Sequence, residues 1–80
     1  MNAVSQSRQA ANGVVVRHPG ILGGTPVFQG TRLPVSTLFD YLADGLSLDY
    51  FLETFPTVTR EQVTAVLRYG QQCLEEELGG

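Results

Sequence analysis

The stretch SLDYFLETFPTVTREQVTAVL, residues 47–67, decides the fold because it holds the start and stop signals of two consecutive helices. Ser47 is a suitable N-cap, and Pro56 ends the helix that follows, since the residue before a proline is pushed out of the α region. Thr59 and Gln62 have the spacing of a capping box, which begins the next helix. A capped helix, a brief turn and a longer capped helix together indicate a helix-turn-helix.

One more helix and a small β element precede this pair. Ser36 is predicted to cap a helix that extends to about Asp44, followed by a glycine at the left-handed position. The β-branched residues 14–16 predict a strand, and residues 27–33 predict a hairpin with its turn at Gly30. The expected fold class is therefore α+β, a small N-terminal β-hairpin element followed by a three-helix helix-turn-helix core.

The length and composition are those of one small folded domain. The 80 residues are 42% hydrophobic and 16% charged, which excludes a disordered chain. The polar segment 1–13 is predicted to be a flexible tail, and residues 14–78 the domain. No apolar run approaches the roughly 20 residues of a membrane span, and no secretory signal is evident, so we expect a cytoplasmic protein without membrane partners.

The charge and the size of the core point to protein partners. The net charge of −3, with five arginines and no lysine, argues against strong non-specific binding to nucleic acid. A core this small, with no disulfide and no metal, often gains stability from a second chain, so a homodimer or a heterologous complex is expected.

Catalysis is not predicted from the sequence. His18 precedes a proline in a turn region, and no nearby nucleophile or acid forms a catalytic pattern with it. Cys73 has no metal-ligand spacing around it, and we expect it to be a small thiol at the edge of the core. We therefore expect a non-enzymatic protein with no cofactor and no metal.

The last helix has two distinct faces. Its apolar face is expected to pack inward and comprises Val63, Val66, Leu67, Gly70 and Leu74. In a helix-turn-helix the last helix enters the major groove, and the residues predicted to contact DNA are Thr57, Thr59, Arg60, Thr64 and Arg68. The first three would hold phosphates and the last two could reach bases. Because Glu61 is acidic and bases are few, a DNA reader and a protein-interaction module are equally supported by these residues.

The run HPGILGGTPVFQGTRLPV, residues 18–35, resembles the opening of the domain-of-unknown-function-433 family. The similarity continues through the Gly-Leu-Ser segment at 45–47, the segment 55–63 and the Leu-x-Tyr of Leu67 and Tyr69, so that it covers about residues 17–72. The sequence departs from the family pattern at His18, where Asp is usual, and at Thr25, where Lys is frequent. The loss of a base at position 25 weakens any role of the hairpin in binding DNA.

The resemblance implies a VapB-type antitoxin of a type II toxin–antitoxin module. Such a protein binds and neutralises a PIN-like ribonuclease toxin, and can repress its own operon by binding operator DNA through the helix-turn-helix. The alternatives are a stand-alone DNA-binding transcriptional regulator and an interaction adaptor with neither activity. The acidic run Glu75, Glu76 and Glu77 is the hypothetical toxin contact, because a PIN-like site is surrounded by bases that hold RNA. A simple solubilising helix end explains this run equally well.

The hairpin has two possible roles. Val27 and Leu33, together with the strand at 14–16, could pair across a two-fold axis to join two protomers, or could cover the base of the helices. Arg32 is expected first to support the fold, by bonding backbone carbonyls or Asp40, and only second to contact DNA.

Overall fold

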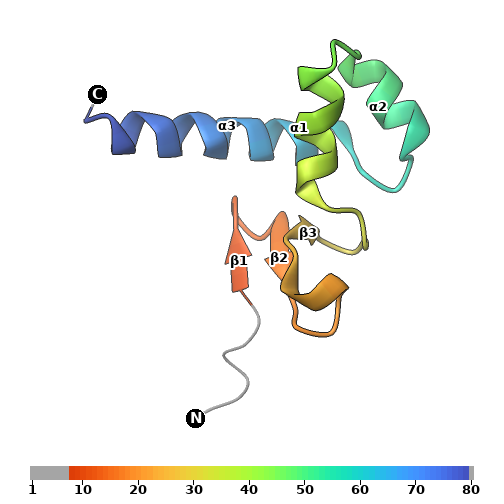
Figure 1. Ribbon diagram of the computed structural model, residues 1–80, viewed down its shortest axis with the longest axis horizontal. Helices are drawn as coiled ribbons and strands as arrows, with labels where there is room; N and C mark the ends of the chain where they lie inside the picture. Colours follow the sequence, from red (N-terminus) through yellow and green to blue (C-terminus); the bar gives the residue numbers. More distant parts are fainter. Residues whose placement is uncertain (1–7, 80) are drawn as a thin grey trace.

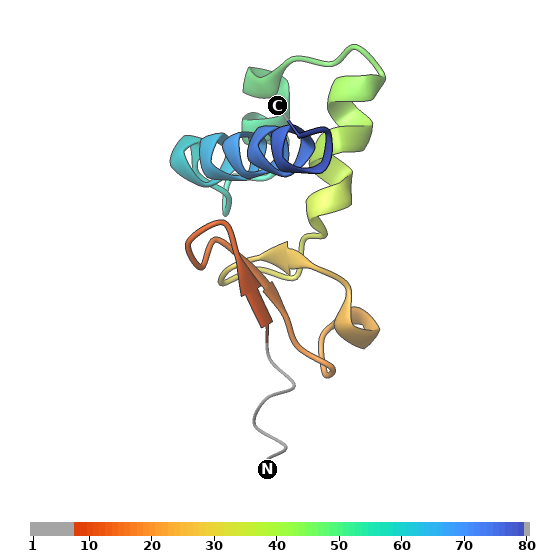
Figure 2. The ribbon, with the colours of Figure 1, turned by 90° about the vertical axis from the view of Figure 1, so that its left-hand side faces the viewer.

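The computed structural model describes residues 8–79 and confirms the α+β fold class, with a three-stranded antiparallel sheet followed by three helices. Figures 1 and 2 show the sheet lying on one side of the helices. The elements in chain order are β1 (Arg8–Ala10), β2 (Val15–Arg17), the 3₁₀ turn η2 (Leu22–Gly24), β3 (Val27–Phe28), α1 (Val35–Ala43), α2 (Leu48–Thr54) and α3 (Arg60–Glu77).

The sheet begins earlier than the sequence suggested. Strand β1 pairs with β2, and the tight turn between them has Ala11 and Asn12 at φ of 54° and 60°. The Gly13 N–H donates to the Ala10 carbonyl at 3.1 Å, which closes the turn. Residues 8–13 therefore belong to a β-hairpin and not to a flexible tail. The sequence carries a signal for this turn, since Asn-Gly, here Asn12-Gly13, is favoured in tight hairpins. The remainder of the predicted tail, residues 1–7, lies outside the described residues.

The hairpin predicted at 27–33 is present in reduced form. The Thr31 N–H donates to the Phe28 carbonyl at 3.0 Å, and Gly30 has a φ of 79°, as a tight turn requires. The returning segment makes a single bridge, between Val27 and Pro34. Val27 and Phe28 are both fully buried, so β3 has no free face.

Helix α1 begins at Val35, two residues earlier than predicted from Ser36 as the N-cap. Its N-cap is Pro34 in an extended conformation, and Ser36 makes no capping bond because it already lies inside the first turn. The C-terminus follows the prediction. Gly45 has a φ of 85°, and its N–H donates to the Leu42 carbonyl at 3.1 Å. The Leu46 N–H donates to the Tyr41 carbonyl at 3.0 Å. This pair of bonds is a Schellman motif.

The caps predicted for α2 and α3 are confirmed. The Ser47 hydroxyl accepts a bond from the Tyr50 N–H at 3.0 Å. The Thr59 hydroxyl accepts from the Gln62 N–H at 3.1 Å, and the Gln62 side chain accepts from the Thr59 N–H at 2.9 Å. The connection over residues 55–59 therefore joins two helices whose ends are set by local sequence.

The core lies where the sheet meets the three helices. Its buried members come from β3, all three helices and the connection before α3, namely Phe28, Leu38, Phe51, Val58, Val63 and Val66. The Phe51 ring lies at its centre, 6.4 Å from the Phe28 ring, 5.5 Å from that of Tyr41 and 5.0 Å from that of Phe55. The Gln62 amide also donates to the Gln29 carbonyl at 3.3 Å, which ties α3 to the end of β3.

Only the first half of α3 packs against this core. Its buried residues are Val63 and Val66, and every described residue from Gln71 onward is exposed. Figure 1 shows the second half extending past α1 and past the sheet. Leu74 and Cys73 are therefore exposed and not at the core or its edge, because no other element reaches that far along the helix. We refer to residues 67–78 as the α3 arm.

Candidate functional site

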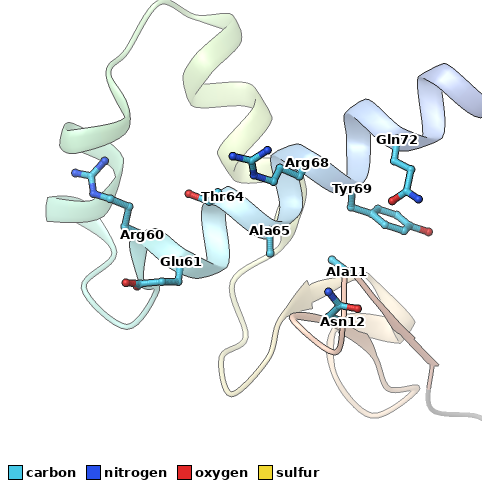
Figure 3. Close-up of a pocket in the computed structure, with 9 residues that line it drawn as sticks. All are labelled: Ala11, Asn12, Arg60, Glu61, Thr64, Ala65, Arg68, Tyr69 and Gln72. Carbon is cyan, nitrogen blue, oxygen red and sulfur yellow. The ribbon is translucent and has the colours of Figure 1, made fainter. Parts of the chain in front are cut away.

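The predicted DNA-contacting residues of α3 form one polar row. Arg60, Thr64 and Arg68 are spaced four residues apart and are all exposed. Figure 3 shows their side chains on the same side of the helix, turned away from the β1–β2 turn. The capping box fixes where this row begins, because it sets the first turn of α3.

A groove of about 640 Å³ runs between this part of α3 and the tip of the β1–β2 hairpin. Figure 3 shows Ala65 and Tyr69 on the side of α3 that faces Ala11 and Asn12. The lining residues are Ala11, Asn12, Arg60, Glu61, Thr64, Ala65, Arg68, Tyr69 and Gln72. The hairpin wall and Tyr69 were not among the residues predicted from the sequence, although the Asn12-Gly13 signal could have revealed the turn.

Arg60 is partly engaged within the chain. Its guanidinium forms an ion pair with Asp49, in the first turn of α2, and the two side chains are 57% and 77% exposed. Pairs this exposed contribute about 0–1 kcal/mol. A phosphate can therefore compete with Asp49 for Arg60 at little cost.

The two threonines before α3 differ in what they can still bind. Thr57 is exposed in the connection between the helices. Thr59 is also exposed, but its hydroxyl oxygen already accepts the capping bond from Gln62, which leaves its proton to donate. Of the five predicted DNA-contacting residues, Arg60, Thr64 and Arg68 lie along the α3 edge of the groove, and these two threonines are not among its lining residues.

Tyr69 offers a neutral phenol at the end of the groove. Its hydrogen bond with the Cys73 side chain is the main reason that its pKa is raised above the ordinary value of 10.0, and the nearby Glu76 carboxylate acts in the same direction. The phenol therefore keeps its proton at neutral pH, engaged with Cys73, and the Tyr69 side chain lines the groove.

The acidic residues at the end of α3 are far from the core. Glu75, Glu76 and Glu77 are exposed in the last turns of the arm, and no basic residue lies in the final turn. The Gln71 amide donates to the Glu75 carboxylate at 3.2 Å. Three carboxylates at the negative end of a helix oppose its macrodipole, and a basic partner would relieve that opposition.

The hairpin residues support the fold, and the strand predicted to pair between protomers is already paired on both sides within the chain. Strand β2 is central, paired with β1 on one side and β3 on the other, so it has no free edge. Val27 is fully buried and Leu33 packs against the core. Arg32 is exposed and makes no hydrogen bond or ion pair within residues 8–79, so the expected bonds to backbone carbonyls or Asp40 do not form.

Within the part of the chain that the structure describes, no three His, Cys, Asp or Glu side chains gather as a metal site. None of the described helices is long and apolar enough to cross a membrane.

Comparison with known proteins identifies similarities of sequence. Residues 15–70 match the family described as "Protein of unknown function (DUF433)". The chain is also 39% identical over 62 residues to "Uncharacterized protein y4eO" from Sinorhizobium fredii. The match covers 78% of this chain and 28% of that protein, so the chain spans less than a third of its relative's length. No solved structure matches the chain.

Proposed function

This chain belongs to the DUF433 family, and on that basis we propose that it is an antitoxin that binds and neutralises a PIN-like ribonuclease. The observation that supports the proposal most directly is the α3 arm, which presents Glu75, Glu76 and Glu77 to solvent beyond the core. A helix that extends past its own core with a concentrated charge is suited to contact another macromolecule.

The chemistry of the arm fits a nuclease that binds RNA. Such an enzyme surrounds its acidic metal-binding centre with basic side chains that hold phosphates. Carboxylates on the arm can pair with those bases and occupy the path of the RNA backbone. Complementary charge of this kind speeds association and selects the partner.

The experiment is co-expression of this chain with the product of the adjacent reading frame, followed by size-exclusion chromatography and a growth assay. We expect a stable complex and rescue of growth. The triple variant Glu75→Gln, Glu76→Gln, Glu77→Gln should lose affinity and rescue.

The control removes the same amount of charge elsewhere. Asp40, Asp44 and Glu53 are exposed on or next to α1 and α2, and their conversion to Asn, Asn and Gln should leave binding unchanged. If the wild type and the α3 triple variant bind the partner with equal affinity, the carboxylates do not lie in the interface. The absence of any complex would refute the antitoxin proposal.

A second function, binding of operator DNA, is supported by the polar row Arg60, Thr64 and Arg68 on an exposed side of α3. If the chain is a transcriptional regulator, alone or with a toxin, its affinity for its own upstream DNA should fall steeply with salt. The variants Arg60→Ala and Arg68→Ala should each reduce that slope by about one. A salt-independent or sequence-independent signal would count against this role.

A further inference from the structure

The α3 arm carries an apolar stripe that the described chain covers less and less toward the end of the helix. Leu67, Gly70, Leu74 and Leu78 are spaced three, four and four residues apart, and therefore lie on one face of the helix. The three leucines are 36%, 62% and 82% exposed. The stripe continues the face that Val63 presents to the core, so the packing face of α3 is longer than the core that covers it.

Gly70 makes this face accessible to another backbone. A side chain added at Gly70 would meet nothing within 4 Å, so the space above this position is open. Glycine in the middle of a helix costs about 1 kcal/mol relative to alanine. A helix that packs closely against this position would use the space that the missing side chain leaves.

We propose that the stripe binds the α3 arm of a second copy of this chain, with the two helices antiparallel about a two-fold axis. In one register Leu74 of the partner copy fits over Gly70, and Leu78 of the partner copy lies against Leu67. The two-fold axis repeats both contacts with the copies exchanged. The stripe is thus complementary to itself, as an interface between identical subunits requires.

Charge favours the antiparallel arrangement. Glu75, Glu76 and Glu77 are all exposed in the last turns of each arm. Antiparallel helices place the carboxylates of the two copies at opposite ends of the interface. A parallel arrangement would instead place the acidic ends of the two arms side by side.

The interface is short. Residues 67–78 extend for about 18 Å along each helix, so we expect a dimer that dissociates on dilution. Sedimentation velocity of the full chain alone, from about 1 µM to about 1 mM, should show a shift from the 8.7 kDa monomer to twice that mass. Monomer throughout this range would overturn the proposal.

Substitution of Leu74 tests the stripe without disturbing the core. Because Leu74 is exposed in the single chain, Leu74→Gln should keep the helical circular dichroism of the wild type. Its dimer should be weaker by about 100-fold, since the side chain is lost from both halves of the interface. Leu22→Gln, at an exposed leucine of η2, is the matched control and should leave the dimer intact. A dimer that survives Leu74→Gln would show that another surface joins the copies.

Cross-linking tests the register. Cys73 lies next to the proposed axis and is exposed, so a short bismaleimide should cross-link wild-type dimers. Failure to cross-link a sample that sediments as a dimer would refute the antiparallel register. These measurements use the chain alone, so their outcome is independent of whether a nuclease partner exists.

Discussion

Replacement of Phe51 by alanine should unfold a large fraction of this protein. Phe51 is fully buried and its ring contacts those of Phe28, Tyr41 and Phe55. Truncation of a buried phenylalanine to alanine costs about 3–5 kcal/mol through lost burial and the cavity that remains. An 80-residue domain has a free energy of unfolding of only about 4–12 kcal/mol, so the variant retains little or none of it.

The control is the preceding residue. Tyr50 is half-exposed and stacks on Tyr41 at a centroid distance of 6.1 Å, so Tyr50→Ala should cost about 1 kcal/mol or less. Urea denaturation followed by circular dichroism measures both variants. A loss below about 1.5 kcal/mol for Phe51→Ala, or equal losses for the two variants, would refute the position of Phe51 at the centre of the core.

Three more outcomes follow from local features. Thr59→Ala removes half of the capping box and should lower the free energy of unfolding by about 1 kcal/mol. Thr59→Ser keeps the hydroxyl and should keep most of that stability. An alanine variant as stable as the wild type would argue against the cap. Gly45→Ala forces a side chain into a φ of 85° and should cost about 1–2 kcal/mol in thermal unfolding, while Gly20→Ala, with no such φ and open space around it, should be neutral or slightly stabilising. Asp49→Asn releases Arg60 from its ion pair and should change the free energy of unfolding by less than about 1 kcal/mol. If α3 binds operator DNA, the same variant should bind that DNA more tightly in a filter assay. Weaker binding would contradict the proposed role of Arg60.

The helix ends were the most predictable part of the fold, because they depend on neighbouring residues. Ser47, Thr59 with Gln62, and Gly45 each act through bonds to atoms within five positions, and each takes its predicted role. The error at Ser36 has the same local origin. Two residues suited to begin a helix stand close together, and the fixed φ of Pro34 places the boundary two residues earlier than Ser36 would.

Features that depend on distant parts of the chain were not predictable. The composition of residues 1–13 suggested a tail, but β1 is held by pairing with β2, and the groove exists because this hairpin faces α3. The exposure of Leu74 had a similar cause. A helical period shows which face of α3 is apolar, but not how far the partner helices extend along it.

The separation of α3 into a packed half and an exposed half has an evolutionary consequence. Substitution at Val63 or Val66 must preserve the core, whereas every described residue of the arm from Gln71 onward is exposed, so substitution there leaves the core intact. Residues that stabilise the fold and residues that can select a partner therefore lie on one helix but are under separate constraints. A lineage could exchange the sequence of the arm, and with it the partner, while the domain that holds the arm in place remained the same.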